Sequence, residues 1–271
     1  MSAIERFREL HRAGCFVMPN PWDAGSAKIF HHLGFQALAS TSAGVAFGAG
    51  LPDRVDAVPL PETLAHLRAL VAATPLPVNA DFQAGFAHDA AGVAASVTAC
   101  VATGVAGLSI EDATGDKAQP LYDRATAIER LRAARRAIDA SGVPVVLTAR
   151  CEAVLVGAPD GLATVMDRIV AFAEAGADCL FAPAVYDPAA IAAIVKAVAP
   201  KPVNVLVARP MPGLTLRELT ALGVRRISVG SGLARVAYGA TLRAARAIAD
   251  SGTFDALGDA ATFAELNAIF S

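Results

Sequence analysis

The sequence predicts a closed (β/α)8 TIM barrel, and three observations favour this fold. Short β-like runs alternate with longer helical runs along the whole chain, with no linker and no low-complexity stretch between them. The length of 271 residues is close to the roughly 250 residues that one such barrel takes. The hydrophobic fraction of 55% suits a parallel sheet that is buried on both faces. We therefore expect a single domain over residues 1–271.

The elements follow one another in a regular order. An amphipathic helix over residues 4–11 ends near Gly14, and a strand over 16–18 stops at Pro19. Asp23 is placed to cap the next helix, and Gly104 and Gly142 are typical of helix C-termini. The expected strands are 16–18, 37–40, 78–81, 107–111, 145–149, 179–182, 203–207 and 226–229. The helices that follow them are 23–33, 61–73, 89–103, 126–140, 160–175, 188–198, 216–222 and 233–249, with an amphipathic segment over 254–270 at the end.

Composition and charge narrow the class of protein. The net charge is −2 and the basic residues are spread along the chain, which is not the pattern of a nucleic-acid-binding protein. No apolar run is long enough to span a membrane, and the charged N-terminal helix does not resemble a signal peptide. The four cysteines lack CxxC spacing, so we expect reduced, mostly buried thiols and a cytoplasmic location.

Charged residues stand where three neighbouring strands are expected to end. Asp81 ends the third strand, Glu111 ends the fourth, and Arg150 follows the fifth. In a parallel barrel these ends share the rim where chemistry is done. Two carboxylates suit Mg²⁺, and an arginine can bind a substrate carboxylate through two hydrogen bonds. The alternative is a structural ion pair. We favour a functional site because three charged groups that lose water together need a reason to do so.

Other polar residues near this rim leave more than one interpretation open. Asp112 and Glu152 each follow a rim residue, so the pleat can turn them toward the site or away from it. The glycine-rich residues 41–53 read as a loop whose hydroxyls and amides can hold a carboxylate or enolate oxygen. Trp22, after the first strand, either packs against the first barrel helix or lines the site, and we include it among the candidate substrate-binding residues.

Several motifs, taken together, resemble those of a known superfamily. NPWDAGSA, STSAGVAFGAGLPD, ADFQAGF, LSIEDA and TARCEA occur in this order, and VNVLVARPMPGLTLRELTALGVRRISVGSGL follows later. The chain is thereby similar to the isocitrate lyase/phosphoenolpyruvate mutase superfamily, in particular to its phosphonomutase-like subgroup. The resemblance implies a (β/α)8 barrel, a homotetramer with the eighth helix exchanged between paired subunits, and an assembly role for residues 254–271. It also implies Mg²⁺ and a small 2-oxo acid whose C–C or P–C bond is made or broken.

The resemblance assigns roles to individual residues. Asp81 and Glu111 would belong to the metal shell, and Asp53 to the outer waters of the metal, which makes Arg150, Glu111 and Asp53 the candidate catalytic residues. The carboxylate of the oxo acid would be held by Arg150 together with Ser40, Thr41 and Ser42.

The chain also departs from the superfamily pattern at two places. The metal motif, commonly Asp-x-Asp, is Asn79-Ala80-Asp81 here, which removes one negative charge from the metal shell. The loop after the fourth strand, ATGDKAQPLYD, lacks both the Lys-(Lys/Arg)-Cys-Gly-His sequence of the lyases and the asparagine of the mutases. The general acid is therefore not a cysteine of this loop.

Three functions are consistent with these features. The first is a Mg²⁺-dependent lyase that decarboxylates or cleaves a small 2-oxo or 2-hydroxy dicarboxylate, similar to oxaloacetate or methylisocitrate, through an enolate. The second is a phosphonopyruvate or carboxyphosphonoenolpyruvate mutase, or a hydrolase of a P–C bond. The third is a protein that binds a 2-oxo acid without turnover.

Overall fold

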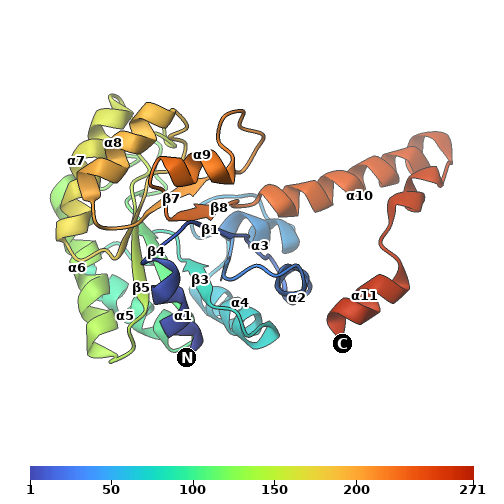
Figure 1. Cartoon of the computed structure of the whole chain (residues 1–271), viewed down its shortest axis with the longest axis horizontal. Coiled ribbons are helices and arrows are strands. Elements are labelled where there is room, and N and C mark those ends of the chain that lie inside the picture. The colour runs from blue at the N-terminus through green and yellow to red at the C-terminus, as the bar shows by residue number, and fades with distance from the viewer.

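The computed structural model describes residues 1–271 and confirms the predicted barrel (Figure 1). Eight parallel strands form one sheet in the order β1-β8-β7-β6-β5-β4-β3-β2. The strands are β1 (Phe16–Met18), β2 (Leu38–Ala39), β3 (Val78–Asp81), β4 (Gly107–Glu111), β5 (Val146–Arg150), β6 (Cys179–Phe181), β7 (Val203–Leu206) and β8 (Arg226–Ser228). Each lies within two residues of the range expected from the sequence, because short apolar runs between glycines and prolines mark buried strands well.

The barrel closes between β1 and β2 without a strand pairing. β2 has only two residues, and β3 is its one strand partner. The gap is bridged by the Ala39 amide, which donates to the Pro19 carbonyl over 3.1 Å. The Asn20 side chain adds a second bridge, donating to the Ser40 carbonyl over 2.9 Å. Side-chain and loop hydrogen bonds thus take the place of the missing ladder.

The helices follow one another in chain order, and most of them surround the sheet (Figure 1). They are α1 (Ala3–Leu10), α2 (Ala24–His32), α3 (Ser42–Gly48), α4 (Leu60–Ala73), α5 (Ala90–Val101), α6 (Arg124–Ala140), α7 (Gly161–Glu174), α8 (Pro188–Val198), α9 (Leu216–Ala221), α10 (Gly232–Ser251) and α11 (Phe263–Phe270), with a 3-10 turn η1 (Asp255–Asp259) before the last. Asp23, Asp89, Asp123 and Asp187 each cap a helix by accepting an amide hydrogen from the first turn. The caps fix where each chain segment turns from the barrel mouth back along its outer surface.

The hydrophobic core has two main parts. A large cluster lies between the strands and the outer helices, with fully buried Val97, Leu108 and Leu147 at its centre. A smaller cluster closes the N-terminal end of the barrel, where Phe7 of α1 packs against Phe16. Since the N-terminal end is filled by apolar side chains, the C-terminal ends of the strands are left to form the site.

The glycine-rich segment 41–53 differs from its prediction as a loop. It contains the helix α3, capped by Thr41, whose Oγ1 accepts the Gly44 amide hydrogen over 3.2 Å. A Cβ on Gly44 would stand only 2.6 Å from Thr41 Cγ2 and 3.1 Å from Trp22 Cβ. Gly44 therefore permits close packing of a helix, and its presence does not signal an irregular loop.

The C-terminal segment leaves the barrel. Figure 1 shows α10 running outward from β8, with α11 turning back toward α2. Lys28 of α2 donates to the Phe270 carbonyl over 2.7 Å, which fastens the last helix to the same chain. No helix in the structure combines the length and apolar character needed to cross a membrane.

Candidate active site

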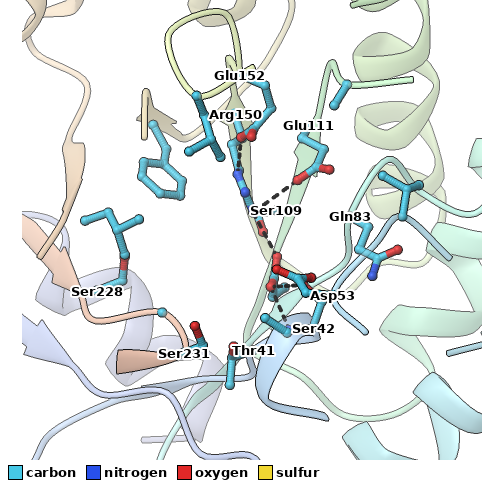
Figure 2. Close-up of a pocket in the computed structure, with 18 of the residues that line it drawn as sticks. Thr41, Ser42, Asp53, Gln83, Ser109, Glu111, Arg150, Glu152, Ser228 and Ser231 are labelled. Atoms are coloured by element: carbon cyan, nitrogen blue, oxygen red, sulfur yellow. Dashed lines mark hydrogen bonds and ion pairs between the residues drawn. The ribbon is translucent and has the colours of Figure 1, made fainter. Parts of the chain in front are cut away.

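The C-terminal ends of the strands surround a cavity of about 640 Å³ (Figure 2). Every strand contributes a residue at or next to its end to the lining. These residues are Met18, Ser40, Asp81, Glu111, Arg150, Phe181, Leu206 and Ser228. The cavity is therefore the site at which the sequence predicts the polar strand ends to meet.

Arg150 is the centre of the charged groups in this cavity. Its Nη1 lies 3.1 Å from a carboxylate oxygen of Asp81 and 3.1 Å from one of Glu111. Its Nε donates to Glu152. The Nη2 atom makes none of these ion pairs, so the guanidinium keeps donors for another anion. The structure thus brings the three predicted residues together, along with Glu152.

Strand register explains why these side chains share one face. Glu111 of β4 lies directly opposite Arg150 of β5, and Asp81 of β3 lies opposite Ser109, two residues before Glu111. Side chains two apart on a strand point to the same side, and neighbours in register do as well. The four residues therefore all point into the barrel.

Asp81 is held on its other side by the segment that begins α3. The backbone amide and the hydroxyl of Ser42 donate to Asp81 Oδ2 over 2.9 and 2.8 Å. The Asp81 amide in turn donates to Ser40 Oγ over 2.8 Å. Ser40, Thr41 and Ser42 all line the cavity. However, Thr41 Oγ1 also accepts the Gly44 amide, so each of the three hydroxyls already has a protein partner.

The carboxylates outnumber the cations in this cluster. Asp81, Glu111 and Glu152 share the single guanidinium of Arg150, which leaves a net charge of −2 when all three are ionised. Burial raises the pKa of Glu111 to about 8, although Arg150 acts in the opposite direction. Burial also opposes the charge of Arg150, but Glu111, Glu152 and Asp81 together raise its pKa above the ordinary value. With its carboxylates ionised, the cluster therefore carries more negative than positive charge.

Asp53 lies at the edge of the cavity and Trp22 lies outside it. Asp53 lies on the segment between α3 and α4, where its residue is largely exposed to solvent but its carboxylate lines the cavity. Partial desolvation of the carboxylate there and, next, the nearby Asp81 raise its pKa. Trp22 does not line the cavity. It packs against the cluster that contains Phe30 and Leu70, between α2 and the barrel. The sequence left two positions possible for Trp22, in the core or at the site, and the structure shows that it packs against the core.

The side chains of Asp112 and Glu152 point in different directions, a difference that the sequence does not predict. Asp112 Oδ2 accepts from Arg168 over 2.9 Å, and its Oδ1 accepts the Glu152 amide over 2.8 Å. Asp112 thus turns toward α7 and holds the backbone after β5. Glu152 turns inward to Arg150 and lines the cavity.

Asn79 lies below the charged cluster. It is buried, its Nδ2 donates to the Ala80 carbonyl, and its Oδ1 has no hydrogen-bond partner. That oxygen lies close to the inner face of Gly107 and so points toward the closed end of the barrel. The amide therefore does not take part in the carboxylate cluster around Arg150.

The donor set fits a magnesium ion that keeps most of its waters. No three His, Cys, Asp or Glu side chains are placed to hold a metal ion by themselves. Mg²⁺ commonly takes only one or two carboxylates and completes its shell with water and substrate oxygens. Glu111 and Asp81 supply such oxygens in a cluster of net negative charge. A divalent cation would balance that charge.

Gln83 is a cavity residue that the sequence reasoning missed. It is buried, and its backbone has the left-handed φ of +47°. Its Oε1 accepts the Asp56 amide hydrogen over 2.8 Å, which ties the segment bearing Asp53 to the end of β3. With that oxygen engaged, the amide nitrogen is the group left for the cavity. The signal in the sequence was its position two residues after Asp81, but no pattern there specifies where the side chain points.

Comparisons with known proteins agree with this architecture. The family model described as phosphoenolpyruvate phosphomutase matches residues 7–249. The 2-methylisocitrate lyase of Salmonella typhimurium is 34% identical over 171 residues, which cover 60% of this chain and 56% of that enzyme.

Two solved structures illustrate the similarity in three dimensions. A Burkholderia cenocepacia J2315 protein, provisionally described as a lyase/mutase, has a TM-score of 0.94 and 46% identity over 99% of this chain and 95% of its own. An oxaloacetate acetylhydrolase in complex with its product oxalate has a TM-score of 0.87 and 25% identity, over 99% of this chain and 94% of its own.

Proposed function

Because the chain belongs to the isocitrate lyase/phosphoenolpyruvate mutase superfamily, we propose that it is a Mg²⁺-dependent lyase for a small 2-oxo or 2-hydroxy dicarboxylate. The reaction is C–C cleavage or decarboxylation through an enolate. One observation carries the proposal. Three carboxylates share one guanidinium at the open end of a large cavity, and that guanidinium keeps free donors.

The residues of the chain would act first by positioning the substrate. Nη2 of Arg150 is available to bind a substrate carboxylate, while Nε and Nη1 are held by Glu152, Asp81 and Glu111. These ion pairs fix the guanidinium before the substrate arrives, so the arginine side chain loses little conformational freedom when the substrate binds. Ser40 and Thr41 lie on the same lining and can donate to the second carboxylate oxygen.

The bond change is the same for the two reactions in its essentials. In decarboxylation the electron pair of the breaking C–C bond passes to the adjacent C2 carbonyl, and CO2 and an enolate are formed. In cleavage of a 2-hydroxy diacid, the C2 hydroxyl proton passes to a base and the C2–C3 bond breaks. C2 becomes the oxo carbon of one product, and the electron pair of the broken bond enters the C3 fragment as the enolate of its carboxylate. A proton then adds to the enolate carbon. No cysteine lines the cavity, so water that enters from the open end is the proton source that we propose.

Asp81 and Glu111 are the residues that would hold Mg²⁺, with Asp53 hydrogen-bonded to its outer waters. The ion, when bound, polarises the C2 oxygen of the substrate and offsets charge that develops there. Because burial raises the pKa of Glu111 to about 8, a cation beside it would favour its ionised form near neutral pH.

A matched pair of variants tests this proposal. Purified protein is incubated with Mg²⁺ and a panel of 2-oxo and 2-hydroxy diacids, and CO2 release and 2-oxo acid products are measured. We expect turnover of at least one compound, and a loss of about 100-fold or more in kcat/KM for Glu111→Gln. Glu129→Gln makes the same chemical change at an exposed position on α6 and should retain activity.

The outcomes separate the candidate functions. Equal activity of Glu111→Gln and Glu129→Gln would contradict the assignment of Glu111. A rise in melting temperature with Mg²⁺ and oxalate but no turnover would indicate a binding protein. Conversion of phosphonopyruvate, followed by phosphorus NMR, would indicate mutase or hydrolase chemistry instead.

The C-terminal segment is proposed to serve assembly. Val236 and Leu242 of α10 are 65% and 54% exposed, and Phe254 and Phe263 beyond it are 65% and 89% exposed. A row of large apolar side chains with this exposure is typical of a surface that another chain covers. We propose that residues 254–271, together with α10, pack on a second copy of the chain in a homo-oligomer.

A further inference from the structure

A buried ion pair lies outside the cavity, and the proposed mechanism does not use it. Nη1 of Arg168, on α7, lies 2.9 Å from Oδ2 of Asp112, and the two side chains are 10% and 1% exposed. Neither residue lines the cavity. Burying two charges costs solvation free energy that their mutual attraction need not return, so stability alone does not explain the pair. Its other contacts indicate a second role.

Asp112 holds the chain at the end of β5. Its amide donates to the Arg150 carbonyl over 3.2 Å, and its Oδ1 accepts the Glu152 amide hydrogen over 2.8 Å. The backbone is thereby held at two points, one on each side of Cys151. From this position Glu152 turns its side chain inward, where it accepts from Nε of Arg150 (Figure 2). The direction of the Arg150 guanidinium therefore depends on Asp112.

Arg168 adds a further segment to this arrangement. Its Nη2 donates to the Tyr122 carbonyl over 2.9 Å, and the Tyr122 amide donates to the Asp112 carbonyl over 2.9 Å. Tyr122 follows the loop of residues 113–121, in which Lys117 lines the cavity. The planar guanidinium of Arg168 thus reaches two acceptors at once, and it fastens both Asp112 and the end of this loop to α7.

The orientation of Arg150 matters because only part of its guanidinium is free. Its Nε and Nη1 are engaged by Glu152, Asp81 and Glu111, which leaves Nη2 for another anion. A guanidinium binds a carboxylate best when the two groups lie in one plane. Without Glu152 on Nε, the guanidinium would be free to turn, and Nη2 would point elsewhere. A misplacement of about 1 Å can slow a catalysed step by about 100-fold.

We propose that Asp112 and Arg168 are a positioning pair, which acts through Glu152 to hold Arg150 in the direction that binds a substrate carboxylate. This inference rests on the proposed function only for the identity of the bound anion. The pair itself would not contact the substrate, because neither residue lines the cavity. It fixes a cavity residue from the layer of helices outside the barrel.

The test removes both buried charges together. Asp112→Val combined with Arg168→Met, which we call the pair variant, leaves neither charge buried without its partner and is expected to fold. Arg124→Gln combined with Asp167→Asn is the matched control. These two residues form an ion pair over 2.7 Å that also joins the start of α6 to α7, but their side chains are 50% and 57% exposed. Urea unfolding checks that each protein is folded.

Two measurements follow the consequences for Arg150. The first is the proton–nitrogen NMR signal of Arg150 Nε in the free protein, identified by its absence in Arg150→Lys. This signal should shift or broaden in the pair variant and stay unchanged in the control. The second is calorimetric binding of oxalate in the presence of Mg²⁺. Its Kd should rise by about 10-fold or more in the pair variant and stay unchanged in the control.

A double-mutant cycle with Arg150→Lys separates positioning from a general loosening of the fold. The lysine ammonium is a point charge without a planar fork, so it depends little on orientation by Glu152. In the Arg150→Lys background the pair variant should therefore raise the Kd for oxalate by less than about twofold. An equal rise in both backgrounds would contradict a positioning role.

The results distinguish a failure of this inference from a failure of the proposed function. An unchanged Arg150 signal in the pair variant would overturn the positioning pair, whether or not any diacid is turned over. If the signal changes but the wild type neither binds oxalate nor turns over a diacid, the lyase proposal is wrong and the positioning pair stands.

A second variant covers the case in which the pair variant does not fold. Arg168→Lys keeps a positive charge beside Asp112 but loses the fork that also reaches Tyr122. The Arg150 signal and the Kd for oxalate should change in the same directions as in the pair variant, by smaller amounts. Wild-type values of both in Arg168→Lys would then overturn the inference.

Discussion

At the scale of single residues, Arg226 is unusual because it is fully buried and none of its contacts is a carboxylate. Its Nε donates to Asn204 Oδ1 over 2.9 Å and its Nη2 donates to Thr148 Oγ1 over 3.0 Å. Its Nη1 lies 3.3 Å from His11 Nε2. An arginine cannot accept a hydrogen bond, so Nε2 is the acceptor and His11 Nδ1 donates to the Phe7 carbonyl over 2.7 Å. His11 is therefore neutral in the folded protein.

The first prediction concerns pH and His11. Burial and, next, the charge of Arg226 lower the pKa of His11 from 6.5 to about 3. Between these values the unfolded chain binds a proton that the folded protein does not, so stability falls as pH falls below 6.5. At pH 5 this difference in proton binding lowers the free energy of unfolding by up to about 2 kcal/mol. His11→Gln offers an oxygen in place of Nε2 and should remove this pH-dependent loss.

Urea unfolding at pH 7 and pH 5 measures the effect. The loss of unfolding free energy between the two pH values should be larger in the wild type than in His11→Gln. His32→Gln, at an exposed position on α2, should behave as the wild type does. The same loss in all three proteins would show that His11 is protonated as readily in the folded as in the unfolded state.

The sequence was sufficient for residues whose side-chain direction depends only on their position in a strand. Asp81, Glu111 and Arg150 each stand at or near the last residue of a strand, so their convergence followed from the fold. It did not separate Asp112 from Glu152, because Arg168, 56 residues from Asp112 along the chain, is what draws that carboxylate away from the cavity. Long-range partners of this kind leave no local pattern.

At the scale of elements, the weakest join in the barrel lies between β1 and β2. Asn20 connects three strand ends there. Its Nδ2 donates to the Ser40 carbonyl, and its Oδ1 accepts the amide hydrogens of Val229 and Gly230, each over 2.9 Å. The side chain is buried, so water cannot replace these bonds. Asn20 thus fixes the segment that carries the hydroxyls of the cavity.

The second prediction follows from this join. Asn20→Ala leaves one carbonyl and two amides without partners, and we expect a loss of about 2–3 kcal/mol in unfolding free energy. Because Ser40 precedes the residues that hold Asp81, binding of oxalate should weaken as well. Gln36→Ala, at an exposed position before β2, controls for the loss of a side-chain amide. Unchanged stability of Asn20→Ala in denaturant titrations would mean that the barrel closes by backbone contacts alone.

At the scale of elements, the prediction failed at segment 41–53, because a glycine can serve two different structural purposes. Segment 41–53 contains several glycines and was expected to be a loop, but α3 forms there because Thr41 caps it and Gly44 packs closely against Thr41 and Trp22. A glycine needed for close approach and a glycine needed for an irregular backbone are identical in sequence. The distinction depends on which side chains lie opposite.

At the scale of the whole molecule, the third prediction concerns α10 and the C-terminal residues 254–271. If α10 and residues 254–271 pack on a second copy, the full chain should sediment as an oligomer. Leu242→Asp combined with Phe263→Asp places charges on side chains that are 54% and 89% exposed here, so it should shift the protein toward the monomer. Leu162→Asp, at a site on α7 that is 44% exposed, should not. Analytical ultracentrifugation gives the measurement, and a wild-type monomer would contradict the proposed assembly.

By itself, the sequence determined the fold class, the order of its elements and the carboxylates and arginine that meet at the barrel mouth. These follow from local periodicity, from caps, and from the rule that parallel strands end at one rim. Only the tertiary structure decided that Glu152 faces the site while Asp112 does not, that Trp22 packs against the core, and that Gln83 lines the cavity. The physical reason is that side-chain direction beyond a strand end depends on partners far away in the chain, whose distances become fixed only when the barrel closes.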